Sequence, residues 1–393
     1  MVSERMKQLG TARSAIRELF EYGKLRAAQV GAENVFDFSI GNPSVPAPGA
    51  VNDTAIRLLT EQPGLIHAYT SAQGAADARQ RFADSLNRRF GANYTADRLY
   101  LTAGAAASLC CVFNGLTCPG DEYIVFAPYF PEYKVFIEGS GAKMVLIPPE
   151  IESFQIDFDA FEGAVSPNTK GVVINTPNNP SGVVYSRATL ERLAAILTRK
   201  SAEYGHPIYL ISDEPYREIV YAGFEAPWVP HIYRDTIVCY SFSKSLSLPG
   251  ERIGYVLVPQ EAADGGSVYP AVAGARRSLG YVCAPALFQQ VTSICCDMTA
   301  DLKIYEENAK MFTAALREMG YHVVEPGGAF YLFPRSLEPD DIAFSERAKK
   351  LDLLIVPGTG FGAPGHVRIS YCVQPDTIRR ALPKFQALAD SSR

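Results

Sequence analysis

The residues best suited to chemistry lie in one stretch, Cys-Tyr-Ser-Phe-Ser-Lys-Ser-Leu-Ser-Leu-Pro-Gly-Glu-Arg-Ile-Gly-Tyr at positions 239–255. A β-type run ends there in small hydroxyl residues around Lys244, and Arg252 follows beyond a Pro-Gly turn. Burial beside a guanidinium makes a lysine lose its proton more easily, which turns it into an amine nucleophile. Ser241, Ser243 and Arg252 supply donors suited to one phosphate group. The alternative interpretation is a strand end that carries an ordinary surface lysine.

Pyridoxal phosphate requires an amine beside a phosphate clamp, because its aldehyde forms a Schiff base with a lysine. Asp213 ends an apolar run, where its carboxylate is placed to keep a pyridinium nitrogen protonated. Such a pair at ~4 Å and an effective dielectric of ~20 interacts by about 4 kcal/mol before desolvation. Tyr216, three residues on, is placed to donate to the phenolic oxygen of the ring. The alternative for Asp213 is a helix N-cap.

Three further segments offer contacts to the same planar, anionic group. Asn179 lies in the rigid loop Asn-Thr-Pro-Asn-Asn-Pro-Ser-Gly and offers both donors and an acceptor. The free N–H groups of residues 105–107, at the start of a helix, are suited to an anion. Phe130 is placed to stack on a heterocycle. Each has an ordinary structural alternative: a turn, a common helix start and a core aromatic.

Arg368 is a lone charge inside the apolar run Gly-His-Val-Arg-Ile-Ser-Tyr. Burying arginine without a partner is costly, so we expect a counter-anion. That anion is either a structural carboxylate or the α-carboxylate of a bound amino acid, held bidentately.

The middle of the chain alternates strand-like runs with helical periodicity, and helices are predicted at 105–116 and 188–200. This alternation favours an α/β fold with a mainly parallel sheet covered by helices, whose ligand lies beyond the carboxyl ends of the strands. The predicted strands of this region are Tyr123–Phe126, Lys143–Ile147, Gly171–Asn175, Ile208–Asp213, Thr236–Ser241 and Arg252–Val258.

The two ends of the chain have a different pattern, which predicts a smaller α+β domain. We expect residues 3–31 to be helical and two helical stretches to follow residue 283. The predicted late strands are His322–Glu325, Ala329–Phe333, Leu353–Val356 and His366–Ser370, before a closing helix. We therefore predict a large cofactor-binding domain at 50–282 and a small domain formed by 1–49 and 283–393.

Composition narrows the class of protein. A net charge of −5 over 393 residues argues against nucleic acid as a partner. No apolar run is long enough for a membrane span, and the first residues lack the pattern of a signal peptide. Eight cysteines without Cys-x-x-Cys spacing indicate free thiols in a reducing cytoplasm, and five scattered histidines show no metal-ligand spacing. We expect a cytoplasmic, metal-free enzyme.

The combination of Asn-Pro-Ser-Gly, Asp-x-x-Tyr and Ser-Phe-Ser-Lys followed by Arg252 resembles the class I/II aminotransferases, pyridoxal-phosphate enzymes of fold type I related to aspartate aminotransferase. The resemblance runs from about Phe36 to the closing helix. It implies a seven-stranded large-domain sheet between helices, a homodimer with shared sites, and ping-pong transfer of an amino group between an L-amino acid and a 2-oxo acid.

The resemblance also implies a role for each matching residue. Lys244 is expected to form the Schiff base and to move the substrate proton, and Arg368, Asn179 and Gly41 to bind the substrate. Tyr69 matches a residue that reaches the neighbouring subunit's phosphate. The expected cofactor contacts are Ala105, Ala106, Ala107, Phe130, Asn179, Asp213, Tyr216, Ser241, Ser243, Lys244 and Arg252.

The chain departs from the family pattern at two points. The phosphate loop carries three alanines where many relatives have Ser or Gln, and no arginine is identified for a dicarboxylate side chain. Asn42, Ser44 and Tyr331 are further candidates for shaping the pocket. A β-lyase, decarboxylase or racemase on the same scaffold stays open, as does a non-enzymatic ligand-sensing relative, although the acidic net charge disfavours a DNA-binding regulator.

Overall fold

A seven-stranded sheet forms the centre of the larger part of the molecule. The computed structural model describes residues 1–11 and 14–392. The strand order is β2-β8-β7-β6-β5-β3-β4; β8 runs antiparallel to both its neighbours, and the other pairs are parallel. Its strands are β2 (Leu99–Thr102), β3 (Glu122–Phe126), β4 (Lys143–Ile147), β5 (Thr169–Asn175), β6 (Tyr209–Asp213), β7 (Thr236–Ser241) and β8 (Gly254–Leu257). The predicted α/β class is confirmed.

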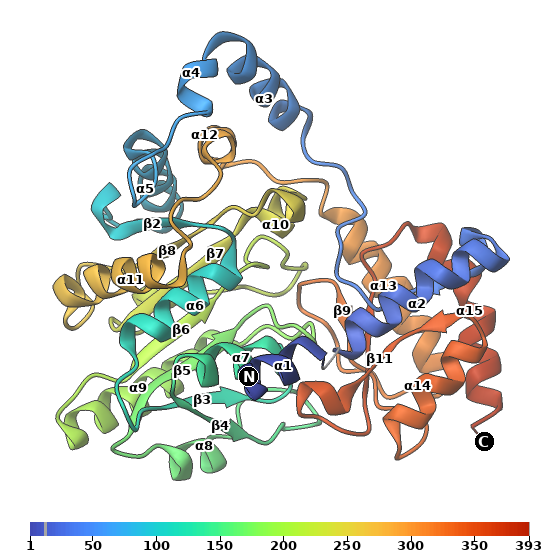
Figure 1. Ribbon diagram of the computed structural model, residues 1–393. Helices are drawn as coiled ribbons and strands as arrows, with labels where there is room; N and C mark the ends of the chain where they lie inside the picture. Colours follow the sequence, from blue (N-terminus) through green and yellow to red (C-terminus); the bar gives the residue numbers. More distant parts are fainter. Residues whose placement is uncertain (12–13, 393) are drawn as a thin grey trace.

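Helices cover both faces of this sheet, as Figure 1 shows. Successive residues of a strand point to opposite faces, so Val125 and Val173 join one core while Ile124 and Val172 join the other. The helices of this part are α3 (Gly49–Glu61), α4 (Pro63–Ile66), α5 (Ala76–Phe90), α6 (Ala105–Leu116), α7 (Glu132–Gly139), α8 (Phe158–Ala164), α9 (Arg187–Tyr204), α10 (Phe242–Ser245), α11 (Gly265–Leu279) and α12 (Ala286–Ile294).

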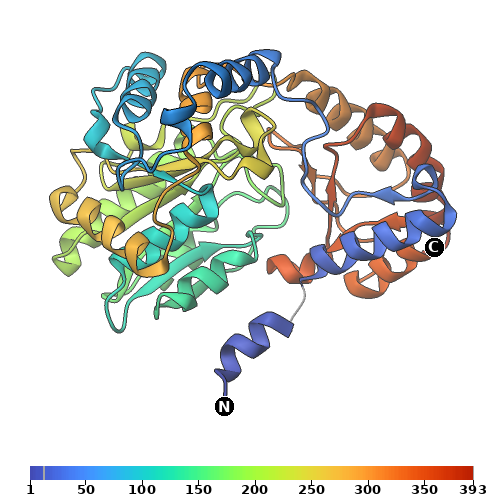
Figure 2. The same ribbon diagram turned by 45° about the horizontal axis from the view of Figure 1, so that its top comes forward.

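The two ends of the chain pack together in a second, smaller part, drawn in blue and red in Figures 1 and 2. Its strands are short: β1 (Phe36–Asp37) pairs in parallel with β10 (Leu353–Leu354), and β11 (Val356–Pro357), β12 (Val367–Ser370) and β9 (Tyr331–Leu332) form an antiparallel sheet. Its helices are α2 (Ala15–Val30), α13 (Lys303–Glu318), α14 (Asp341–Lys350) and α15 (Pro375–Asp390). Helix α1 (Glu4–Thr11) has no buried residue and stands apart from this part in Figure 2.

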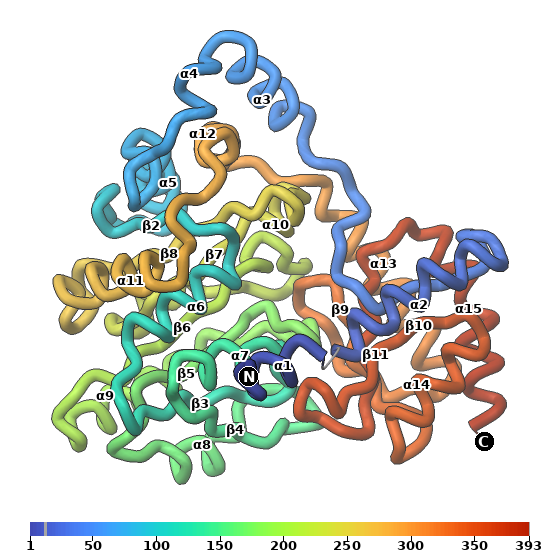
Figure 3. Tube along the Cα trace, in the orientation of Figure 1, coloured from blue at the N-terminus to red at the C-terminus, as the bar shows by residue number. Residues whose placement is uncertain are grey.

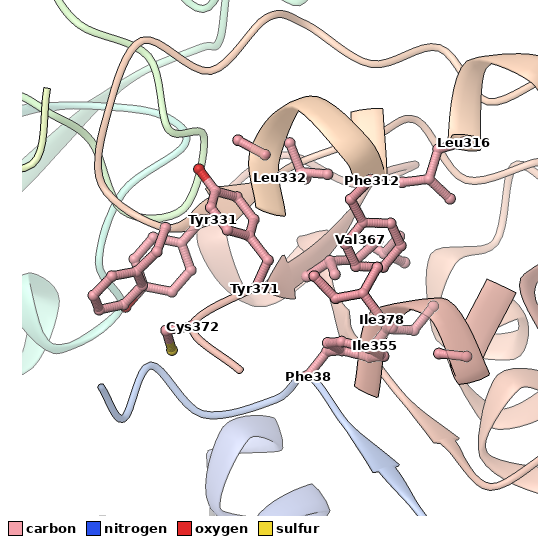
Figure 4. Close-up of a cluster of buried hydrophobic side chains, with 14 of the residues drawn as sticks. Phe38, Phe312, Leu316, Tyr331, Leu332, Ile355, Val367, Tyr371, Cys372 and Ile378 are labelled. Carbon is pink, nitrogen blue, oxygen red and sulfur yellow. The ribbon is translucent and has the colours of Figure 1, made fainter. Parts of the chain in front are cut away.

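Apolar side chains from both ends of the chain fill one core in this smaller part. Phe38 contacts Phe312 and Phe385 with ring centroids 5.4 and 5.9 Å apart. Figure 4 shows Phe38 in this cluster with side chains such as Ile355 and Val367. The N-terminal segment is thus held by residues more than 270 positions away, and Figure 3 traces the chain from it across to α3.

Most of the predicted helices and strands are present, and the prediction of one strand is wrong. Residues 322–325 form no strand; one backbone bond, from Arg335 N to His322 O at 3.0 Å, ties this segment to the chain that follows. Isolated apolar pairs such as Val323 and Val324 suggest a strand, but a strand also needs a neighbour with which to form a ladder. The helix expected over 3–31 is observed as α1 and α2, with residues 12–13 outside the described part. Within that part, no helix is long and apolar enough to cross a membrane.

Candidate functional site

A cavity of about 280 Å³ lies beyond the carboxyl ends of the parallel strands, and most of the predicted site residues line it. Folds of this kind bind their ligands at the carboxyl edge of the sheet. The predicted residues that line it are Gly41, Ala105, Ala106, Phe130, Asn179, Asp213, Tyr216, Ser241, Ser243, Lys244, Arg252 and Arg368. Ala107 is buried outside this lining, and Tyr69 lies elsewhere with its surface 98% exposed.

Lys244 projects into the cavity from the one-turn helix α10. Its Nζ donates to the carbonyl oxygen of Gly41 at 2.5 Å. Burial lowers the pKa of Lys244 to about 8, and the positive charges of Arg368 and Arg252 also lower it. A lysine with this pKa holds a substantial fraction of neutral amine near neutral pH, which is the nucleophilic form.

Asp213 ends β6 in a fully buried position. Tyr133 donates from its hydroxyl to Asp213 Oδ2 at 2.5 Å, whereas Oδ1 is buried without a hydrogen-bond partner among the described residues. Burial raises the pKa of Asp213 to about 7, against the lowering effect of the Tyr133 hydrogen bond. A buried carboxylate oxygen without a hydrogen-bond partner lowers the stability of the fold. It therefore indicates a site for a donor from a ligand, and a cationic donor would suit the carboxylate best.

Asn175, which the sequence analysis did not single out, fixes two of the predicted residues at once. Its Nδ2 donates to the backbone carbonyl of Asp213 at 2.9 Å, and its Oδ1 accepts from the backbone N–H of Asn179 at 2.7 Å. Tyr133, which donates to Asp213, is also not among the predicted site residues. The signal for Asn175 was its place at the end of β5, whereas nothing in the sequence points from Tyr133 to Asp213.

One end of the cavity is shaped for an anion. Ser241 Oγ and Ser243 Oγ lie 2.6 Å apart, and Ser241 also caps α10 by accepting from the N–H of Ser243 at 3.1 Å. Arg252 Nη1 donates to the carbonyl of Pro249 at 3.0 Å. A Cβ added to Gly104, which has φ +82°, would lie 2.7 Å from Arg252 Nη2, so this position requires glycine. The first N–H groups of α6 open toward the same end.

Arg368 lies at the other end and is 2% exposed. Its Nη1 donates to Asn179 Oδ1 at 3.0 Å, its Nη2 donates to the carbonyl of Ser39, and its Nε has no partner in the described part of the chain. The Tyr331 ring lies 4.9 Å from the guanidinium carbon. No carboxylate of the described residues is within ion-pair distance, so the structural-pair alternative lacks its anion.

Aromatic groups complete the walls. Tyr216 and Tyr331 share a hydrogen bond of 2.8 Å between their hydroxyl oxygens. The Tyr331 hydroxyl packs so closely on Gly41 that a side chain at position 41 would collide with it. Phe130 lies at the cavity face of its turn, with its ring centroid 5.6 Å from that of Tyr133.

Comparisons with known proteins agree on one family. Residues 33–385 match the family model described as aminotransferase class I and II. The chain is 30% identical over 396 residues to the aspartate aminotransferase of Thermotoga maritima, covering 100% of both chains. It is 30% identical over 351 residues to the aspartate/prephenate aminotransferase of Thermus thermophilus, with 88% of each covered.

Solved structures show the same likeness. An amino transferase from Eubacterium rectale superposes with a TM-score of 0.97 at 54% identity, covering 100% of this chain and 99% of that one. The Thermotoga maritima aspartate aminotransferase gives a TM-score of 0.88 at 29% identity, with 99% of this chain and all of that one covered.

Proposed function

Because the chain belongs to the class I and II aminotransferase family, we propose that the cavity around Lys244 is its active site and that the motif residues have the roles their positions indicate. The protein is a pyridoxal-phosphate-dependent aminotransferase, as the resemblance implied. The observation that carries the proposal is one cavity lined by a lysine of lowered pKa, an unpartnered carboxylate oxygen and an arginine without an ion pair.

The residues present fit pyridoxal phosphate. The free Oδ1 of Asp213 suits the ring nitrogen, and the Ser241, Ser243 and Arg252 cluster with the start of α6 suits the phosphate. Phe130 suits one ring face. When bound, the cofactor supplies an aldehyde that takes up an amino group and a ring that accepts electrons.

Each of these side chains has a separate role in the proposed reaction. The Lys244 amine would hold the cofactor in the resting enzyme and, once released, would move a proton at the Cα of the substrate. With the cofactor bound, Asp213 would keep the ring nitrogen protonated, and Asn179 and Tyr216 would hold the phenolic oxygen. Arg368, whose Nε lacks a partner, would bind the α-carboxylate, and this contact would orient the Cα–H bond of the substrate toward Lys244.

A second copy of the chain is the proposed partner. Tyr69 is 98% exposed beside a hollow of about 350 Å³ lined by residues of the segments 66–70 and 283–286. A large contiguous patch of exposed apolar surface marks an interaction site. Leu65, Tyr281 and Val282, exposed by 50%, 40% and 55%, support a homodimer in which Tyr69 reaches the other subunit. The eight free cysteines support a cytoplasmic location.

The division into domains at 50–282 and at 1–49 with 283–393 is also a proposal. The shared core of Phe36, Phe38 and the C-terminal residues supports a small domain made from both ends. Val291 of α12 packs with Val51 of α3, however, which favours a second boundary nearer residue 300.

A visible spectrum of the purified holoenzyme tests the proposed function. Adding a substrate amino acid should remove the visible absorbance of the bound cofactor, and a 2-oxo acid should restore it. Absorbance that no amino acid changes, or that decays with release of ammonia, sulfide or CO₂, would contradict aminotransfer and indicate lyase or decarboxylase chemistry.

A further inference from the structure

Two pairs of buried tyrosines share hydroxyl hydrogen bonds within one core of the molecule. The hydroxyl oxygens of Tyr216 and Tyr331 lie 2.8 Å apart, and those of Tyr221 and Tyr371 lie at the same distance. All four side chains belong to the core of the smaller part, and Figure 4 labels one member of each pair, Tyr331 and Tyr371. Only the first pair is among the described residues that line the cavity around Lys244.

The Tyr216–Tyr331 pair has one proton to spare. Each hydroxyl carries one proton, and the bond between the two hydroxyls uses one of them. No other hydrogen-bond partner of either hydroxyl is present in the described part of the chain. In the second pair the Tyr221 hydroxyl also donates to the backbone carbonyl of Ala329, so its proton already has an acceptor. The spare proton of the first pair therefore indicates an acceptor that comes from a ligand.

Arg368 indicates which of the two hydroxyls is the donor within the first pair. Its guanidinium carbon lies 4.9 Å from the centre of the Tyr331 ring. Burial raises the pKa of Tyr331 to about 12 against the lowering effect of Arg368, and burial raises the pKa of Tyr216 well above its ordinary value. Both hydroxyls therefore keep their protons near neutral pH. The positive charge loosens the proton of Tyr331, which makes Tyr331 the donor and leaves the proton of Tyr216 for the cavity.

We propose that Tyr331 is a positioning residue for the cofactor: its hydroxyl donates to Tyr216 and thereby directs the Tyr216 proton to the phenolic oxygen. The inference rests on the proposed function and deepens it. Hydrogen bonds in a chain polarise one another, so the donation by Tyr331 strengthens the donation by Tyr216. The Tyr331 ring also lies against Arg368, so one side chain joins the group that would bind the α-carboxylate to the group that would hold the phenolic oxygen.

The pH dependence of the visible absorbance tests this role in the holoenzyme without substrate. A donor to the phenolic oxygen stabilises its anionic form, so a weaker donor raises the pH at which the bound cofactor loses its proton. Tyr331→Phe keeps the ring against Arg368 and removes the hydroxyl. The midpoint of the absorbance titration should therefore rise by about 0.5 pH unit, a roughly 3-fold change in proton affinity. Tyr371→Phe is the matched control, because it removes a hydroxyl from the pair outside the cavity lining, and it should leave the midpoint unchanged.

A double-mutant cycle shows whether Tyr331 acts through Tyr216. Tyr216→Phe alone should raise the midpoint by about 1 pH unit or more, because it removes the donor itself. In that background Tyr331→Phe should add no further shift. Shifts that add in the double variant would mean that Tyr331 acts independently and would overturn the proposal. A downward shift in Tyr331→Phe would also overturn it, because Tyr216 would then be the donor within the pair.

The parent protein separates this inference from the proposed function. A parent that gains no visible absorbance with pyridoxal phosphate would overturn both. If amino acids change the absorbance but Tyr331→Phe leaves the midpoint where it is, the inference alone fails. If the midpoint rises as expected but no amino acid changes the absorbance, aminotransfer fails and the role of Tyr331 stands. The dissociation constant of pyridoxal phosphate is the second readout, and it should rise about 3-fold in Tyr331→Phe and stay unchanged in Tyr371→Phe.

Tyr331→Leu separates the ring from the hydroxyl and provides a second variant if Tyr331→Phe does not fold. It lacks the hydroxyl, so the midpoint should rise as in Tyr331→Phe. It also lacks the ring against Arg368, so the KM for amino and oxo acids should be about 3- to 10-fold higher than in Tyr331→Phe. A rise in KM without any shift of the midpoint would reduce Tyr331 to a neighbour of Arg368 and overturn the proposal.

Discussion

The cofactor end and the substrate end of the cavity are built in different ways. At the cofactor end, Asn179, Asp213 and Ser241 follow or end neighbouring strands of one sheet, and backbone hydrogen bonds between those strands fix their spacing. At the substrate end, Ile16, Ile40, Gly41, Tyr331 and Arg368 come from the two ends of the chain and meet only because α2, β1, β9 and β12 pack together.

The two modes of construction indicate that the substrate end tolerates substitution better than the cofactor end. A sheet edge that serves the cofactor tolerates few substitutions, because each residue has a strand register and a buried partner, as Asn175 has to both Asp213 and Asn179. The substrate end depends on single side chains that come from the two ends of the chain. Apart from the Tyr331 hydroxyl, changes at the substrate end should therefore alter substrate binding without disturbing the cofactor, and the predictions below test that separation.

The largest effect is expected from Lys244→Ala, at the junction of the two ends. The variant loses both the amine that holds the cofactor and the group that moves the Cα proton, so kcat should fall by at least ~10⁴-fold. The visible absorbance of the bound cofactor should change with it. Lys244→Arg keeps the positive charge but has no neutral amine near pH 8 and should be equally inactive. Retention of the wild-type spectrum in either variant would remove Lys244 from its role.

Asp213→Asn should lower kcat by about 10³-fold, because an ion pair of about 4 kcal/mol with the ring nitrogen is lost. Without cofactor, the same change should stabilise the fold. The pKa of Asp213 is raised to about 7 by burial, against about 4 when unfolded. Between these values the folded protein binds more protons, so its free energy of unfolding falls as pH rises toward 7 and stays reduced above it.

Urea unfolding of the cofactor-free proteins at pH 8 checks this second effect. Asp213→Asn is expected to be more stable than the parent by roughly 2–4 kcal/mol at pH 8, and the difference should shrink as pH falls toward 4. A variant that is less stable at both pH values would show that Asp213 is satisfied by the protein itself, and the need for a ligand cation would disappear.

Arg368→Ala tests the substrate end alone. We expect KM to rise about 100-fold for amino and oxo acids alike, because a buried bidentate contact worth about 3 kcal/mol is lost. Cofactor occupancy should not change, because Arg368 lies at the opposite end from the phosphate residues. Arg276→Ala is the matched control: Arg276 is 3% exposed, has an unpartnered Nε and lies outside the cavity lining. Loss of fold in Arg368→Ala but not in Arg276→Ala would restore a structural role for Arg368.

The contrast between the two ends also explains which site residues the sequence alone predicts. Residues of the cofactor end, such as Asp213 and Lys244, were predicted because each sits in a short pattern at the end of a strand whose apolar run is visible. The strands at Lys143–Ile147 and Thr236–Ser241 and the helix at Ala105–Leu116 are present with the predicted bounds. Local sequence patterns are therefore sufficient to predict the cofactor end, because its residues lie at the ends of regularly spaced strands.

Residues of the substrate end lack such patterns. Ile16 resembles an ordinary core residue in the sequence, and only the packing of α2 against the C-terminal part places it in the cavity lining. The sequence predicts Arg368 as a site residue because a charge inside an apolar strand is unusual. Only the structure shows that no described carboxylate pairs with it. Tyr69 and the dimer stay predictions, because their partner is a second copy of the chain.

The smallest effect is expected from Tyr133→Phe, which touches only the support of the cofactor end. The variant loses the 2.5 Å hydrogen bond to Asp213 Oδ2, worth about 1–2 kcal/mol, so the pKa of Asp213 should rise further. Cofactor affinity and kcat/KM should fall about 3- to 10-fold, with the loss concentrated at low pH, where Asp213 takes up its proton. Tyr123→Phe removes a buried hydroxyl that accepts from Thr117 at 3.3 Å outside the cavity, and it should leave both quantities unchanged. If the two variants have the same pH profile, Tyr133 is a core residue and Asp213 is positioned by Asn175 alone.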